Sequence, residues 1–212
     1  MAPNEMRKGA DAQPLVRIID DQPAVREAIA DLLASMGMAT RSYALAREFL
    51  HDDDQSAPGC VVLDVRMPEM GGFELVDALD DQPIELPVVF VTGHGDIPMA
   101  VRAMKAGAVD FLSKPFDDQR LIDAVNAANR IDAARRAKIA PTLEARERLK
   151  LLSDGERSVL DLIVCGLRNK QIAAELGISE ITVKVRRGRL MDKLAVNSTV
   201  GLVRLVDQAL EK

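Results

Sequence analysis

Near the middle of its first half the chain reads Gly59-Cys60-Val61-Val62-Leu63-Asp64-Val65-Arg66-Met67-Pro68, an apolar run that ends in one carboxylate and breaks at a proline. Consecutive apolar residues that end in an acid are typical of a buried parallel strand. The last residue of such a strand emerges at the carboxyl edge of the sheet, where open α/β sheets place their binding groups. The stretch therefore predicts an α/β fold in which Asp64 carries the chemistry.

Apolar runs of strand length alternate with helical patterns on both sides of this stretch. Alternating units of this length predict a parallel sheet that helices cover on both faces. We expect strands at residues 15–19, 38–43, 59–64, 87–92 and 109–112, and helices at residues 24–36, 45–50, 73–79, 96–107 and 117–131.

The pattern changes after residue 131. The segment 132–148 is rich in Ala, Arg, Lys and Glu, and Pro141 interrupts its helical tendency, so we interpret it as a partly helical linker. Beyond it only helical patterns occur, at about residues 154–164, 169–176, 179–194 and 198–209. We predict four segments: a disordered tail at 1–13, an α/β domain at 14–131, the linker at 132–148 and a small all-α domain at 149–212.

Charge and composition restrict the function classes. Residues 1–130 carry 12 Lys and Arg against 22 Asp and Glu, a net charge of −10, whereas residues 131–212 carry 16 against 11, a net charge of +5. An acidic half joined to a basic half favours a module that handles cations or phosphate, followed by a nucleic-acid binder. We see no signal peptide and no membrane span, and we expect a cytoplasmic protein whose two cysteines form no disulfide.

Polar side chains follow four of the predicted strands. Asp20 and Asp21 follow the first strand, Asp64 ends the third, Thr92 ends the fourth and Lys114 follows the fifth. Because parallel strands point the same way, these side chains should gather at one edge of the sheet. Three carboxylates at close range favour a divalent cation, and Mg²⁺ fits because it prefers oxygen ligands and engages phosphate. Asp64 would then be a nucleophile toward phosphorus, with Lys114 and Thr92 contacting phosphoryl oxygens.

The motifs around these residues are Asp20-Asp21 and the stretches 64–72, 91–96 and 110–116. Together they closely resemble the receiver domain of two-component response regulators, over about residues 14–131. The resemblance implies a flavodoxin-like (βα)5 fold with parallel strand order 2-1-3-4-5.

The resemblance also implies a role for each site residue. Asp64 would be phosphorylated by a sensor histidine kinase, and Lys114 and Thr92 would contact the phosphoryl group. Phe111 would be an aromatic switch that acts with Thr92, although a residue at the end of a buried strand is also compatible with plain core packing. Lys114-Pro115 would be a cis bond, and Mg²⁺ would be held by Asp20, Asp21, Asp64 and the backbone carbonyl of Arg66.

In the basic half, two predicted helices meet at a short turn between Arg168 and Leu194. Gly177 fits a left-handed turn position, and Ser179 is a helix cap. The second helix carries five basic and two acidic residues over 179–194, which is enough to attract phosphates. A solvated cationic face on an ordinary bundle helix is the alternative.

The entry motif at residues 169–173 and the core at 182–185 resemble the LuxR/FixJ-type helix-turn-helix domain, over about residues 149–212. The resemblance implies that Lys184 and Val185 contact bases, and that phosphates are contacted by Thr182, Arg187, Arg189 and Lys170. The chain departs from the usual pattern at Arg186, where histidine is common, at residues 153–156, where Pro-Arg often precedes the Glu, and at Gly188, which leaves a gap.

We therefore predict a transcription regulator that phosphorylation of Asp64 controls by shifting dimerisation or interdomain contacts. Its expected partners are a sensor histidine kinase, promoter DNA, RNA polymerase and, on phosphorylation, a second copy of the chain, with no membrane. It would not be an enzyme beyond slow self-catalysed phosphotransfer and autodephosphorylation. The alternatives are a Mg²⁺-dependent phosphohydrolase, which would lack the second carboxylate because Arg66 stands two residues after Asp64, and a constitutive DNA binder with a vestigial receiver.

Overall fold

The computed structural model describes residues 13–52, 57–80, 86–93 and 95–211. The chain divides into two compact units between Arg135 and Arg136, and we describe each by itself. The predicted disordered tail lies, except for Gln13, outside the described residues.

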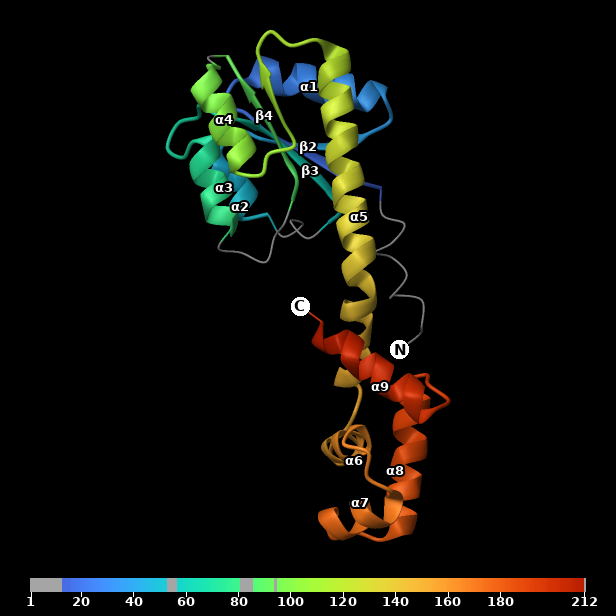
Figure 1. Ribbon diagram of the computed structural model, residues 1–212. Coiled ribbons are helices and arrows are strands. Elements are labelled where there is room, and N and C mark those ends of the chain that lie inside the picture. The colour runs from blue at the N-terminus through green and yellow to red at the C-terminus, as the bar shows by residue number, and fades with distance from the viewer. Residues whose placement is uncertain (1–12, 53–56, 81–85, 94, 212) are drawn as a thin grey trace. The chain divides into compact units, whose positions relative to one another are not determined.

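The N-terminal unit is built around a parallel five-stranded sheet with the order β2-β1-β3-β4-β5, which confirms the predicted order (Figure 1). Strands and helices alternate along the chain as the sequence predicts. The elements are β1 (Leu15–Ile19), α1 (Pro23–Ser35), β2 (Ala39–Tyr43), α2 (Ala46–Leu50), β3 (Gly59–Asp64), α3 (Gly72–Asp80), β4 (Val88–Thr92), α4 (Ile97–Lys105), β5 (Asp110–Ser113) and α5, which begins at Asp118.

Two apolar cores lie on opposite faces of this sheet. Every residue of β3 is buried, because its side chains alternate between the two faces. Val61 and Leu63 pack in the core that α2, α3 and α4 cover, whereas Cys60 and Val62 pack in the core that α1 and α5 cover. Figure 1 shows these two groups of helices on either side of the strands. The double burial explains why β3 reads as one continuous apolar run.

Helix α5 differs from the prediction. It runs without interruption from Asp118 to Lys150, with Pro141 in its interior, so the segment 132–148 is helical throughout where we expected a partly helical linker and a helix end near residue 131. An interior proline costs a helix about 3 kcal/mol. Good helix formers surround it, and Glu144 pairs with Arg148 four residues later at 2.5 Å. The domain limits drawn from the sequence stay predictions.

The C-terminal unit contains, besides the end of α5, four helices: α6 (Asp154–Val164), α7 (Asn169–Leu176), α8 (Glu180–Lys193) and α9 (Thr199–Leu210). They close around one apolar core, to which α5 contributes Ala145. Its fully buried members include Val159, Ile172, Val183, Leu190, Leu194 and Leu202. Within the described part of the chain, no helix has both the length and the apolar character needed to cross a membrane.

Gly59 leaves no room for a side chain between β1 and β3. Its φ is +139°, and a Cβ atom at this position would lie 2.0 Å from the carbonyl oxygen of Leu15. The two residues are partners in the β1–β3 register. A side chain here would therefore push apart the two central strands that carry Asp20 and Asp64.

We expect Gly59→Ala to lower the free energy of unfolding by more than about 3 kcal/mol, because strain and a backbone clash add. Gly107→Ala is the matched control, since Gly107 also has a positive φ of +81° but has no atom within 4 Å of a Cβ. It should cost only about 1 kcal/mol. Urea unfolding followed by circular dichroism measures both, and equal losses would contradict the clash.

Candidate functional site

The polar residues that follow the strands of the N-terminal unit lie at one edge of its sheet. Asp20 follows β1, Asp64 is the last residue of β3, Thr92 is the last residue of β4 and Lys114 follows β5. Asp20, Asp64 and Thr92 are 0%, 3% and 1% exposed. The parallel register sets this arrangement, because each of these strands ends within one residue of the end of its neighbour.

One ammonium group joins two buried carboxylates at this edge. Lys114 Nζ lies 2.5 Å from Asp20 Oδ2 and 2.7 Å from Asp64 Oδ1. The backbone positions it, since the Lys114 amide donates to the carbonyl of Thr92 at 2.7 Å and the Lys114-Pro115 bond is cis, as the resemblance implied. One cation from the neighbouring loop thus offsets part of the repulsion between the two acids.

Two of the remaining carboxylate oxygens accept backbone amides, and one oxygen of the neighbouring Asp21 is buried. Asp64 Oδ2 accepts the amide of Arg66 at 2.7 Å, and Asp20 Oδ1 accepts the amide of Gln22 at 2.9 Å. Asp21 Oδ1 is buried, and within the described structure it has no hydrogen-bond partner. Asp21 therefore offers an oxygen that residues 13–52, 57–80, 86–93 and 95–211 leave unsatisfied.

The two charged partners shift each other's proton affinity. Burial raises the pKa of Asp64 above its ordinary value, although the hydrogen bond and charge of Lys114 act against the rise. Burial lowers the pKa of Lys114, but the hydrogen bonds to Asp20 and Asp64 outweigh it, so the pKa of Lys114 is raised. Lys114 is thereby held as a cation beside Asp64.

The donor set at this edge fits magnesium in its chemistry. Asp20, Asp21 and Asp64 supply hard carboxylate oxygens, one of them without a partner. In the arrangement described, the Lys114 ammonium is the counter-charge of Asp20 and Asp64. No group of three or more His, Cys, Asp or Glu side chains among residues 13–52, 57–80, 86–93 and 95–211 is spaced to enclose a metal ion.

The C-terminal unit presents a helix-turn-helix. Helix α7 ends at Gly177, whose φ of +63° is left-handed, and Ser179 Oγ accepts the amide of Thr182 at 3.0 Å to cap α8. Lys184, Val185 and Arg189 are exposed on α8. The turn chemistry is the one that the sequence predicts.

Comparison with known proteins identifies both units. Residues 16–126 match the family model of the response regulator receiver domain, and residues 150–206 match that of bacterial regulatory proteins of the luxR family. The response regulator protein TodT of Pseudomonas putida is 42% identical over 203 residues, which are 96% of this chain and 89% of TodT. The transcriptional regulatory protein FixJ of Rhizobium meliloti is 44% identical over 190 residues, 90% of this chain and 93% of FixJ.

Among solved structures, that of the response regulator StyR aligns with a TM-score of 0.78 and 45% identity, and covers 93% of this chain and 100% of StyR. The chain belongs to the two-component response regulators. This response regulator combines a receiver with a LuxR-type DNA-binding domain and acts in transcription regulation. Its relatives are regulators and not classical enzymes, which favours this function over the phosphohydrolase alternative.

Two features of the regulator escaped the sequence reasoning. A Cβ at Gly95 would lie 2.9 Å from the ring of Phe111 and 2.6 Å from Ser113 Oγ, so a larger residue at position 95 would displace these two side chains. Phe111 itself is half-buried and packs against the core below α2, α3 and α4. Gly95 stands in the 91–96 motif, but the motif by itself assigns it no contact.

The second feature is the bonding of the arginines on α8. Arg187, predicted to contact phosphate, donates to Asn169 Oδ1 at 3.1 Å and to Thr199 Oγ1 at 2.6 Å. Arg186 donates to the carbonyl of Gly155 at 3.5 Å. Gly155 and Arg186, which both depart from the usual LuxR pattern, are therefore in contact.

The end of α8 is tied to the start of α6. Lys193 Nζ lies 2.7 Å from Glu156 Oε2, and the same carboxylate accepts the amide of Ser153 at 2.9 Å in the capping box that the sequence predicts. The hydrogen bond from Lys193 and then that from the Ser153 backbone lower the pKa of Glu156 to about 2. Both bonds are stronger to the ionised form, because a charged acceptor strengthens a hydrogen bond.

We expect Glu156→Gln to destabilise the DNA-binding domain at pH 7, and the loss to shrink as the pH falls. A depressed pKa contributes stability above the ordinary value of 4.5, and this contribution disappears as the pH falls toward about 2. Thermal unfolding at pH 7, 5, 4 and 3 measures it, with the exposed Glu175→Gln as the control that changes little. A loss independent of pH would contradict the ionic origin.

Proposed function

We propose that a sensor histidine kinase phosphorylates this response regulator on Asp64, and that the phosphoryl group controls its binding to promoter DNA. The observation that supports this most is the Lys114 ammonium, which lies within 2.7 Å of both Asp20 and Asp64 at the sheet edge. A carboxylate with an adjacent fixed cation suits attack on a phosphoryl donor.

The transfer needs a nucleophile, a charge sink and positioning. One oxygen of the Asp64 carboxylate forms a bond to phosphorus, and the leaving histidine of the kinase keeps the electron pair of the broken P–N bond. When bound, Mg²⁺ neutralises charge on the phosphoryl oxygens, and Asp20, Asp21, Asp64 and the backbone carbonyl of Arg66 would hold it. In this proposal the protein accepts a phosphoryl group, and the only reaction that it catalyses afterwards is its own slow dephosphorylation.

Phosphorylation would redistribute the bonds at the edge. It adds about 1.5 to 2 negative charges, which compete with Asp20 for the Lys114 ammonium and offer an acceptor to the Thr92 hydroxyl. Movement of Thr92 and Lys114 then changes the loop after β4 that passes Phe111 at Gly95. We propose Phe111 as the switch on this ground.

The surface that would respond lies on α4. Ile97, Val101 and Met104 are 81%, 47% and 52% exposed, and their spacing places them on one side of the helix. We propose that phosphorylation pairs two receivers through the face formed by α4, β5 and α5, or changes interdomain contacts. Two DNA-binding domains then hold paired half-sites. A transcription regulator of this kind would have RNA polymerase as a further partner and would be located in the cytoplasm.

On DNA, we propose that α8 enters the major groove. Lys184 and Val185 are exposed on one face and would contact base edges. Arg189 and Lys170, both exposed, together with Thr182, would contact phosphates. The guanidinium of Arg187, by contrast, is bonded within the domain.

We expect the wild-type chain to take up one phosphoryl group from acetyl phosphate in the presence of Mg²⁺, and Asp64→Asn to take up none, because the amide is not a nucleophile. Intact-mass spectrometry measures the uptake. Asp31→Asn, an exposed acid on α1, is the matched control and should be phosphorylated normally. Uptake by Asp64→Asn, or none by the wild type with any donor, would refute the proposal.

Two further measurements separate the alternatives. Promoter binding that is equal for the wild type and Asp64→Ala, with and without phosphodonor, would favour a constitutive binder. Repeated turnover of phosphate monoesters would favour the phosphohydrolase.

We expect Val185→Ala to relax base preference without changing the salt dependence of binding, since the valine side chain carries no charge.

Arg189→Gln should weaken binding to all sequences and reduce the slope of log K against log salt by about 0.9, because one phosphate contact is lost. Fluorescence anisotropy over a salt series measures both. An unchanged slope for Arg189→Gln would remove it from the interface.

A further inference from the structure

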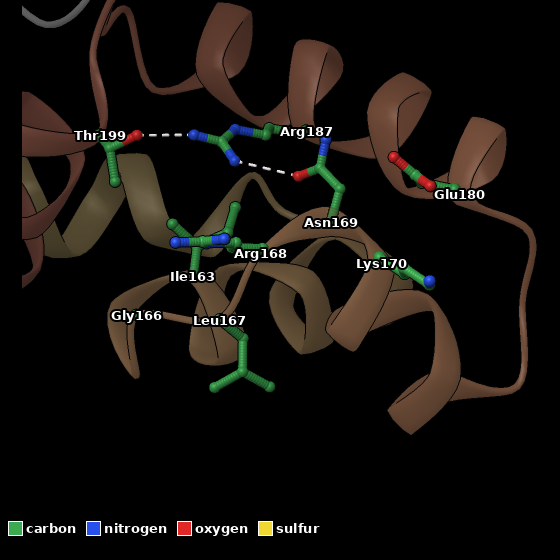
Figure 2. A pocket seen from close by; sticks show the side chains of 9 residues that line it. All are labelled: Ile163, Gly166, Leu167, Arg168, Asn169, Lys170, Glu180, Arg187 and Thr199. Carbon is green, nitrogen blue, oxygen red and sulfur yellow. Dashed lines mark hydrogen bonds between the residues drawn. The ribbon is translucent and has the colours of Figure 1, made fainter.

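Arg187 joins three helices of the DNA-binding domain. It lies in the middle of α8, and its guanidinium donates to Asn169 Oδ1, 3.1 Å away, and to Thr199 Oγ1, 2.6 Å away. Asn169 is the first residue of α7 and Thr199 is the first residue of α9. Figure 2 shows the guanidinium between these two side chains. One side chain therefore connects α8 to the starts of both flanking helices.

The bridge lies in a surface hollow. The hollow has a volume of about 500 Å³ and is lined, besides the three bridge residues, by Ile163, Gly166, Leu167, Arg168, Lys170 and Glu180. Arg187 is half-buried there, whereas Arg189, two residues later, is exposed. Arg187 and Arg189 thus have different surroundings although they stand close in the sequence.

Both acceptors of Arg187 are neutral oxygens, so the contact is a geometric link and not a charge pair. A planar guanidinium presents its donors in a fixed fork and reaches two acceptors on different helices at once. A lysine ammonium keeps the charge but has no such fork. The structure therefore separates the charge of Arg187 from its bridging geometry, and a substitution can do the same.

We propose that Arg187 is a positioning residue, which fixes the recognition helix α8 against α7 and α9 and does not contact a DNA phosphate. The two bonds hold the guanidinium between α7 and α9 and use two of its five N–H donors, so the salt dependence of binding decides whether the others reach a phosphate. This inference rests on the proposed function in one respect, the placement of α8 in the major groove. It departs from the role that the LuxR resemblance implied for Arg187.

The decisive measurement is the salt dependence of DNA binding by the full chain. The probe is a duplex selected from random-sequence DNA by the phosphorylated wild type. Arg187→Lys and Arg187→Gln should both lower the affinity by about tenfold with an unchanged salt slope. Arg189→Gln, the matched control, should lower the slope by about 0.9.

A second comparison removes the acceptors and leaves every cation in place. Asn169→Ala combined with Thr199→Val should reproduce the affinity loss of Arg187→Gln, and adding Arg187→Gln to that pair should cause little further loss. Wild-type affinity for Arg187→Lys together with a reduced slope for Arg187→Gln would overturn the proposal. So would full affinity for the acceptor double variant.

Hydrogen exchange tests the bridge without DNA. Arg187→Lys should speed exchange of amides in the first turns of α7 and α9, and Arg189→Gln should leave them unchanged. If the wild-type chain selects no DNA at all, the proposed function fails, and this exchange pattern still decides whether Arg187 holds the three helices together. Equal protection in Arg187→Lys and the wild type would overturn the positioning role.

Discussion

Two buried carboxylates share one ammonium at the carboxyl edge of the receiver sheet. Asp20 and Asp64 come from β1 and β3, and each would be costly to bury as an unpaired charge. Lys114 reaches both from the loop after β5. Both carboxylates therefore depend on the same cation, and a phosphoryl group on Asp64 would compete with Asp20 for the Lys114 ammonium. Everything that we propose for signalling starts from that competition.

In the DNA-binding domain, contacts at several points hold helix α8 in place while one face of it stays exposed. Helix α8 is capped by Ser179 at its start, bridged by Arg187 in its middle and tied by Lys193 to Glu156 at its end. Its apolar side packs through Val183 and Leu190. The polar side chains of α8 thus divide into those that fix the helix and those that remain exposed.

Much of this was predictable from local patterns. The continuous apolar run of β3 indicates burial on both faces, and an acid at its end must emerge at the sheet edge whatever the helices do. The capping box at Ser153 and the left-handed turn at Gly177 are likewise local, because they depend on residues within one or two turns. Parallel strands then bring Asp20, Asp64 and Lys114 together without further information.

The sequence by itself indicated an α/β unit followed by an all-α unit and a polar site at the sheet edge, since hydrophobic period and chain direction dictate them, whereas the order of the strands came from the resemblance to receiver domains. Only the tertiary structure decided that α5 continues through Pro141. The interior proline costs the helix about 3 kcal/mol, and packing of the end of α5 in the C-terminal core offsets this cost. The tertiary structure also decided the partners of Arg187 and the approach of Gly95 to Phe111. Contacts made by long side chains, or by a loop against a ring, depend on which segments the fold brings together, and no local pattern encodes that.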